Sequence, residues 1–192
     1  MERKCIISML CAFLIAGFAT PVAPAIDKRP VAVERWCEKL PHAKEKLTKL
    51  HFFFHDVVSG KNETVVRVAE SKATAKSPTV FGAVFIMDDP LTEGPEPSSK
   101  IVGRAQGIYS SASMEEIGFL MTLNFVFTNG QYNGSSLSVL GYNPIFKKYR
   151  EMPILGGSGH FRLARGIATA KTYRLSASGD AIVEYHVMVL HY

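Results

Sequence analysis

Residues 49–58 read KLHFFFHDVV, with three consecutive phenylalanines between two histidines and an aspartate directly after them. Aromatic and β-branched residues at this density favour a strand over a helix. Successive side chains of a strand point to opposite faces, so both histidines share one face, while Phe52, Phe54 and Asp56 share the other. The segment therefore predicts a strand whose aromatic face ends in a carboxylate.

The two histidines of this segment, His51 and His55, are too far apart to bind one metal ion. Four residues along a strand span about 13 Å at about 3.3 Å per residue, whereas on a helix the same spacing would place both ligands on one face. We therefore expect no metal. The sequence also carries no haem, copper or flavin pattern, so we expect no cofactor.

The rest of the chain continues the pattern of short apolar runs between clusters of Gly, Pro, Asn and Asp, which is typical of all-β proteins. The runs are KLHFFFHDVV, TVVRVAES, VFGAVFIMD, IVGRAQGIYSS, IGFLMTLNFVFT, SSLSVLGY, FRLARGIATAKTYRL and AIVEYHVMVLHY, with REMPIL as a short addition. About eight strands joined by turns such as Asn129-Gly130 predict an eight-stranded antiparallel β-barrel that holds a small ligand.

The N-terminus has the features of a secretory signal peptide. Arg3 and Lys4 precede the apolar run CIISMLCAFLIAGFA and the small residues and prolines of TPVAPA, which predicts cleavage after Ala19 or Ala25. The run is shorter than the roughly 20 residues that span a bilayer, so we expect a secreted protein with no membrane attachment after cleavage. The predicted parts are a signal peptide, an N-terminal arm and a barrel domain, at residues 1–25, 26–48 and 49–192.

Secretion sets the use of cysteines and the prospects for glycosylation. Cys5 and Cys11 fall in the signal peptide, so the mature chain keeps only Cys37, which is either an intermolecular bridge or an unpaired thiol in the arm. Sequons at Asn62 (NET) and Asn133 (NGS) predict sugars on surface turns.

The composition excludes two classes of protein. With 192 residues, 47% hydrophobic and 20% charged, the chain fits one folded domain and not a disordered one. The net charge is +5, but much of the basic excess lies in HAKEKLTKLH, which is interrupted by Glu45 and accompanied by no nucleic-acid motif. We therefore expect no nucleic-acid partner. The stretch HAKEKLTKLH also predicts a short helix.

Three positions are candidates for chemistry. Asp56 either binds the turn amides near Ser59 or acts as an acid whose pKa is raised by apolar walls. In VGRAQGIYSS, small residues and Tyr109 share a face with Gly107, which predicts either a roomy pocket with a phenol or tight sheet packing. Arg165 lies in an apolar run and needs a partner, for which Asp56 is a candidate.

Two other segments complete the picture. GGSGHFRLARG lacks the residues of a phosphate loop or a nucleophile elbow, so its glycines are expected to bend a strand. The last run, DAIVEYHVMVLHY, has one apolar face and one mixed face, as expected where one side is core and the other is a pocket or subunit contact. We therefore expect a homo-oligomer.

The chain closely resembles the plant dirigent proteins. The resemblance covers residues 50–192 and rests on HFFFHD, FGAVFIMDDPLTEGPEPSSKIVGRAQGIYSSAS, LNFVFTNGQYNGSSLSVLG, REMPILGGSGHFRLARG and EYHVMVLHY. It implies an eight-stranded barrel of the dirigent and allene-oxide-cyclase type, trimeric in the family's structures although a dimer also fits, in the apoplast of the cell wall.

The resemblance also implies a function. A separate laccase or peroxidase makes phenoxy radicals, for example from coniferyl alcohol, and the barrel orients them so that coupling is regio- and stereoselective and gives lignan-like products. One alternative is a cofactor-free isoflavonoid dehydratase-cyclase that works through a quinone methide, and another is a non-catalytic barrel that binds phenolics or organises the wall. Asp56 would be the acid, Arg165 would steady negative charge and Tyr109 would bond a phenol oxygen.

The chain departs from the family at one site position. Lignan-forming members commonly carry an aspartate directly after their glycine-rich segment, whereas this chain has His160 there. By this comparison His160 would contact substrate together with Phe52, Phe54 and Gly107, and could act as an acid near neutral pH. The disulfide between the two ends of some members cannot form here, because the chain ends in LHY.

Overall fold

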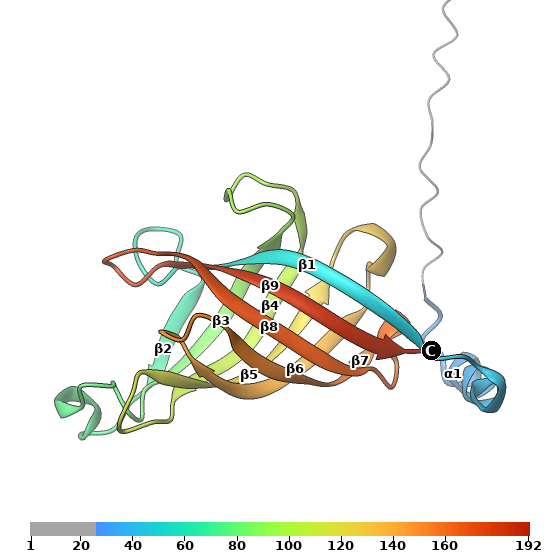
Figure 1. Ribbon diagram of the computed structural model, residues 1–192, viewed down its shortest axis with the longest axis horizontal. Coiled ribbons are helices and arrows are strands. Elements are labelled where there is room, and N and C mark those ends of the chain that lie inside the picture. The colour runs from blue at the N-terminus through green and yellow to red at the C-terminus, as the bar shows by residue number, and fades with distance from the viewer. Residues whose placement is uncertain (1–25) are drawn as a thin grey trace, which may run out of the picture.

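The computed structural model describes residues 26–192, which form one nine-stranded antiparallel sheet and a short N-terminal helix (Figure 1). The helix is α1 (Pro30–Glu38). The strands are β1 (Lys46–Asp56), β2 (Val65–Ala69), β3 (Val84–Thr92), β4 (Ile101–Ser111), β5 (Gly118–Phe127), β6 (Ser136–Pro144), β7 (Arg150–Ser158), β8 (Arg165–Leu175) and β9 (Ala181–His191). The run REMPIL, expected as a short addition, is the start of the full strand β7.

Eight of the strands close into a barrel. The sheet runs in the order β1-β9-β8-β7-β6-β5-β4-β3-β2, and a further pairing between β1 and β3 joins its two sides. The first strand is therefore bonded to the last one on one side and to β3 on the other, while β2 extends β3 outside the ring. The predicted antiparallel barrel of eight strands is confirmed, with one strand added.

The interior of the barrel is aromatic, as the alternation in residues 49–58 predicts. Phe52 and Phe54 are almost fully buried, and the ring of Tyr185 on β9 lies 5.8 Å from Phe52 and 5.9 Å from Phe54. Phe125 on β5 fills the space between the strands, 5.0 Å from Phe52 and edge-on to it. Burying such side chains contributes about 1.5–3 kcal/mol each, so this cluster is a main source of stability.

The small residues of β4 allow close packing and do not enlarge a pocket. A Cβ on Gly107 would lie 2.6 Å from the Cα of Leu123 on β5, and one on Gly103 would lie 3.1 Å from the Cα of Phe127. Both glycines let β5 approach β4. Of the two interpretations of this stretch, tight sheet packing is the one that the structure supports at Gly103 and Gly107.

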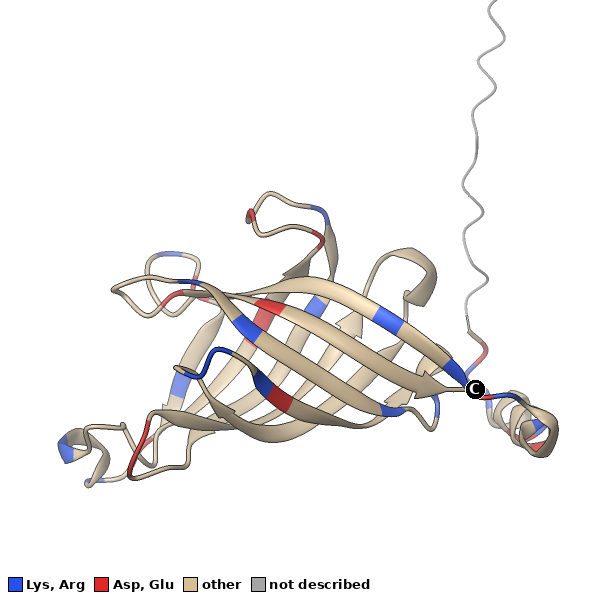
Figure 2. Cartoon of the chain, in the orientation of Figure 1, with Lys and Arg blue, Asp and Glu red and all other residues tan. Residues whose placement is uncertain are grey.

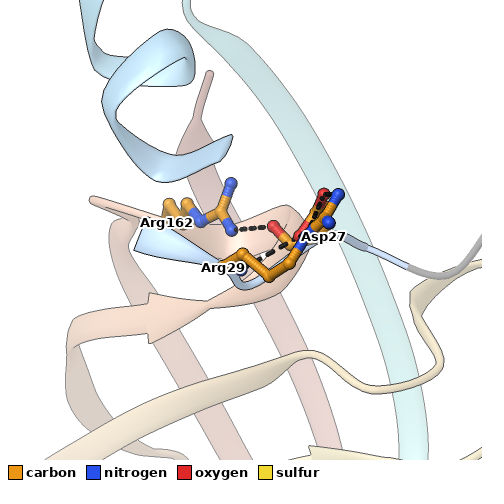
Figure 3. Close-up of polar contacts among 3 residues, drawn as sticks. All are labelled: Asp27, Arg29 and Arg162. Carbon is orange, nitrogen blue, oxygen red and sulfur yellow. Dashed lines mark hydrogen bonds and ion pairs between the residues drawn. The ribbon is translucent and has the colours of Figure 1, made fainter. Parts of the chain in front are cut away.

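The N-terminal arm packs against one end of the barrel. The Arg162 guanidinium donates a hydrogen bond of 2.8 Å to the carbonyl of Asp27 (Figure 3). It also lies 5.4 Å from the centre of the Trp36 ring. The helix occupies residues 30–38, and β1 already begins at Lys46, so the helix expected near HAKEKLTKLH is wrong. Alternating inward side chains in residues 46–56 favour the strand.

The predicted signal peptide, with Cys5 and Cys11, lies outside the described residues. Cys37 is exposed on α1 and is a free thiol. No helix within residues 26–192 is long and apolar enough to cross a membrane. Basic and acidic residues are interspersed over strands and loops in Figure 2 rather than gathered along one side of the barrel.

Candidate functional site

A cavity of about 500 Å³ occupies one end of the barrel. The turn between β8 and β9 and the turn between β6 and β7 surround it, at the end away from α1 in Figure 1. Its walls are mainly apolar, and its polar groups are few. The aromatic walls are Phe54, Phe85, Tyr109, Phe119, Phe146 and Tyr185, and the polar groups include Asp56, Asn143, Arg150 and Thr172. This is the usual make-up of a small-molecule site, whose volume is roughly 300–1,000 Å³.

Asp56 is the acid of this cavity. It is the last residue of β1, and its Oδ1 is buried without a hydrogen-bond partner among the described residues. Burial raises the pKa of Asp56 to about 7, and the nearby negative charge of Asp180 adds to the increase. A carboxylic acid in this environment keeps its proton close to neutral pH.

Asp180, and not Asp56, binds the turn amides near Ser59. The Oδ1 of Asp180, in the turn before β9, accepts hydrogen bonds from the backbone amides of Val58 (2.9 Å) and Ser59 (3.0 Å). The Ser59 hydroxyl donates to both oxygens of the same carboxylate, at 3.0 and 2.8 Å. The turn amides are therefore satisfied by Asp180, and Asp56 is left facing the cavity.

A second buried acid, Asp89, lies close enough to Asp56 for the two carboxylates to repel each other. Asp89 is on β3 and is fully buried; its Oδ1 accepts a very short hydrogen bond from the Thr64 hydroxyl, while its Oδ2 has no partner among the described residues. Burial raises the pKa of Asp89 to about 8, and repulsion from Asp56 adds to the increase. Sequence reasoning missed Asp89, because the predicted run VFGAVFIMD ends at Asp88, whereas β3 continues to Thr92.

Tyr109 lines the cavity, as predicted. Its ring stacks on Phe85, with centres 4.8 Å apart at 21°, and meets the edge of Phe119 at 5.0 Å. Burial, and then the charges of the two aspartates, raise the pKa of Tyr109 above its usual value. Its hydroxyl therefore stays protonated and can donate a hydrogen bond to a ligand oxygen.

The cation of the cavity is Arg150, which sequence reasoning also missed. It is 3% exposed, and its hydrogen bonds within residues 26–192 go to neutral oxygens: Asn143 Oδ1 at 3.0 Å, Thr172 Oγ1 at 2.8 Å and the Lys147 carbonyl at 3.3 Å. Burial lowers the pKa of Arg150. A signal existed in REMPIL, because Arg150 alternates with the apolar residues Met152 and Ile154, and all three are buried.

The prediction that Arg165 faces the pocket is wrong. Its side chain is 63% exposed and its NH1 lies 2.8 Å from Glu45 Oε1. The inward residues of β8 are Ala168 and Ala170. Arg165 is three positions from Ala168 and five from Ala170. Because side chains alternate along a strand, an odd separation from these inward residues means that Arg165 points outward, away from Asp56.

Of the four predicted contact residues, Phe54 alone lines the cavity. Phe52 lies deeper, in the filled half of the barrel, and Gly107 packs against β5. His160 lies in the turn Gly159–Phe161 that follows β7, where its amide donates to Ser135 Oγ at 3.0 Å. These three placements correct the prediction, because Phe52, Gly107 and His160 do not line the cavity.

Together these side chains suit acid-assisted chemistry on an aromatic molecule. The walls bind and orient rings, Asp56 can deliver a proton at neutral pH, and Arg150 and Tyr109 can bind an oxygen on which negative charge develops.

Known proteins match this chain over the barrel. The family model for dirigent-like protein matches residues 47–190, from the start of β1 to the end of β9. Dirigent protein 1 of Arabidopsis thaliana is 56% identical over 174 residues, which cover 89% of this chain and 95% of that protein. Pterocarpan synthase 1 of Glycyrrhiza echinata is 54% identical over 151 residues, covering 78% and 80%. The solved structure of a pterocarpan synthase dirigent protein is 53% identical, with a TM-score of 0.72, and covers 77% of this chain and 89% of that chain.

Proposed function

This chain belongs to the dirigent-like protein family, and on that basis we propose that its cavity controls the regio- and stereochemistry of phenoxy-radical coupling. A separate oxidase, a laccase or peroxidase, removes one electron and one proton from each phenol. Two radicals bound in the cavity then form one bond between them, and the walls decide which carbons and which faces meet. Optically active lignan-like dimers are the products.

The observation that carries this proposal is the aromatic cavity with an acid, Asp56, whose buried Oδ1 has no hydrogen-bond partner within residues 26–192. Coupling leaves quinone methides, which become aromatic again when a proton reaches the carbonyl oxygen and a hydroxyl attacks the methide carbon. Asp56 donates that proton, and its carboxylate takes the proton that the attacking hydroxyl loses, so the acid is regenerated. Arg150 and Tyr109 hold the oxygen that gains negative charge.

A second candidate is a dehydratase-cyclase acting on a hydroxylated isoflavonoid. It is favoured by the raised pKa of Asp56 and by the similarity to pterocarpan synthases. Here Asp56 protonates a leaving hydroxyl, which departs as water, and the phenol that becomes the carbonyl of the quinone methide releases its proton to solvent. A second phenolic hydroxyl of the same molecule closes the ring and gives its proton to Asp56, while the carbonyl oxygen regains a proton from solvent. This reaction consumes no oxidant.

One set of assays separates these candidates. Coniferyl alcohol is incubated with a laccase, with and without the protein, and products are separated by chiral chromatography; isoflavanols are incubated with the protein alone. An enantiomeric excess that requires both protein and laccase supports radical coupling. Turnover without oxidant supports the dehydratase-cyclase, and racemic products with no turnover leave a non-catalytic phenolic-binding barrel.

Two variants locate the effect in the cavity. Asp56→Ala removes the acid, and the effect should disappear with it. Arg165→Gln is the matched control on the outside of the barrel, and it should behave as the wild type. An effect that survives Asp56→Ala would contradict the role of this acid.

The proposal includes secretion into the apoplast with removal of residues 1–25, and glycosylation at Asn62 and Asn133. Both asparagines are exposed in turns, which supports their access to the glycosylation machinery. Mass spectrometry of protein secreted by plant cells tests the N-terminus and both sugars at once. An N-terminus at Met1 would contradict the signal peptide.

The proposal also includes a homo-oligomer. An exposed apolar row crosses the outer face of five strands through paired positions: Val66, Ile86, Ile108, Thr122 and Leu140. Its four aliphatic members are 40–58% exposed. Apolar surface of this extent supports a subunit contact. Light scattering should give a multiple of the monomer mass, and Ile108→Lys should lower it.

A further inference from the structure

Three potential metal ligands meet on the outer face of the barrel, where β1 and β9 pair. His51 on β1 is directly opposite His186 on β9. Glu184 precedes His186 by two residues and therefore points to the same face. The His51 and His186 side chains are 44% and 60% exposed, whereas Glu184 is 18% exposed.

The ligand atoms already converge. The Nε2 of His51 lies 3.0 Å from Glu184 Oε1, and the Nε2 of His186 lies 3.3 Å from the same oxygen. The two imidazole rings have their centres 4.5 Å apart at 31°, and one ligand atom from each residue lies within 4.8 Å of the other two. Ligands of a tetrahedral zinc ion at about 2.0–2.1 Å are separated by about 3.3 Å, so small side-chain movements suffice.

The surroundings favour an oriented ligand set. The Oε1 of Glu184 faces the Nε2 atoms of both histidines. Its other oxygen, Oε2, lies 3.5 Å from Lys171 Nζ, which leaves Oε1 for a cation. The edge of Phe53 packs on the His51 ring at 5.3 Å and restricts its rotation.

We propose that His51, Glu184 and His186 bind one divalent transition-metal ion, Zn²⁺ or Cu²⁺. Two imidazoles and one carboxylate are ligands that these ions prefer over Mg²⁺ or Ca²⁺. Three protein ligands leave a fourth position for water or for a group of another molecule. This set is the one cluster of its kind found within residues 26–192.

Such an ion would link β1, the first strand of the barrel, to β9, the last one. His51 and Glu184 are 133 positions apart in the chain, so the unfolded chain would have to close a long loop to bring these ligands together. Binding to the folded state alone raises the unfolding temperature by mass action. At a free-ion concentration about 100 times the Kd, the expected rise is about 5–10 °C for a domain of this size.

The test uses the secreted protein without a histidine tag, dialysed first against a chelator. Isothermal titration calorimetry with Zn²⁺ and with Cu²⁺ measures affinity and stoichiometry, and thermal unfolding measures the shift; Mg²⁺ is the control ion. We expect one ion per chain and no response to Mg²⁺. His51→Gln and His186→Gln should each weaken binding by about tenfold or more and remove the thermal shift.

His42→Gln is the matched control, because His42 is an exposed histidine in the arm, outside the cluster. It should bind as the wild type does. The proposal is overturned by a Kd weaker than about 0.1 mM for both ions, or by undiminished binding in the two cluster variants. Since these side chains are outside the cavity, either result leaves the proposed function untouched.

Discussion

The proton on Asp56 gives the proposed chemistry a distinct pH dependence. Only the protonated acid can donate, and burial raises the pKa of Asp56 to about 7. We therefore expect the rate of the acid-assisted step to be constant below pH 6 and to fall about tenfold per pH unit well above pH 7. Asp56→Asn should be slower by about 10²-fold or more and should lose this profile. The measurement is product formation against pH, and an unchanged profile in Asp56→Asn would contradict it.

Arg150 is expected to bind a ligand oxygen through its planar fork. Lysine cannot donate to Asn143 and Thr172 at once in the same geometry, so Arg150→Lys should misplace the charge. We expect ligand affinity to drop by about tenfold, the loss of one charge-assisted hydrogen bond. Fluorescence titration with a phenolic ligand measures this, and Arg165→Lys on the outer face serves as control. Equal losses in both variants would refute a specific role for Arg150.

The sequence predicted some site residues and not others, for identifiable reasons. The alternation of side chains along each strand placed Phe54, Asp56 and Tyr109 on the inside of the barrel. The face to which a strand residue points depends only on its own strand, so this could be predicted from the sequence. It could not say how far along the barrel each lies, so Phe52 and Gly107 were assigned to a cavity that begins beyond them. These errors concern depth, which depends on the register between strands.

Strand β4 depends on its glycines for contact with β5. Gly107→Ala would place a Cβ 2.6 Å from the Cα of Leu123. The clash is with the backbone of β5, which cannot move aside as a flexible side chain could. We expect a loss of about 1–3 kcal/mol in the free energy of unfolding. Gly156→Ala on β7, where a Cβ meets nothing within 4 Å, should cost much less. Urea denaturation of the two variants measures the difference, and equal midpoints would contradict the packing argument.

The strands and their antiparallel arrangement were largely predictable, whereas the residue-by-residue register between strands was not. Turn signals and apolar runs located the strands of the barrel, including REMPIL, because these signals are local. The helix in residues 30–38 was missed. The charged residues near Lys46 have a composition typical of helices, but pairing with β9 makes that stretch a strand. The meeting of His51 with His186 also depends on pairing across the barrel and has no local signal.

The whole protein should respond to pH through its two buried acids. Asp56 and Asp89 have folded pKa values of about 7 and about 8, above the ordinary 3.8. Well below pH 3.8 both acids hold their protons in the folded and in the unfolded chain. As pH rises from about 4 to about 8 the unfolded chain releases them first, so the stability of the fold decreases, on the order of a few kcal/mol.

The double variant Asp56→Asn with Asp89→Asn isolates this effect, because asparagine is neutral at every pH and keeps the shape. Its stability should vary less between pH 4 and pH 8 than that of the wild type, and should exceed it at pH 8. Thermal unfolding across this range provides the comparison. Parallel curves for the two proteins would show that these acids do not govern the response.

The pairing of β1 with β9 also bears on how the protein is made. The two strands pair position by position from Lys46 with His191 to Asp56 with Ala181. During synthesis the first strand of the barrel leaves the ribosome long before its partner exists, with Phe52 and Phe54 open to water. Such a chain must be kept from aggregating until the last residues are released, and contacts this distant in sequence form slowly. The barrel is therefore completed only when β9 is available, and a chain that stopped at residue 182 would leave β1 paired with β3 at Phe53 and Phe54 but without its long pairing to β9.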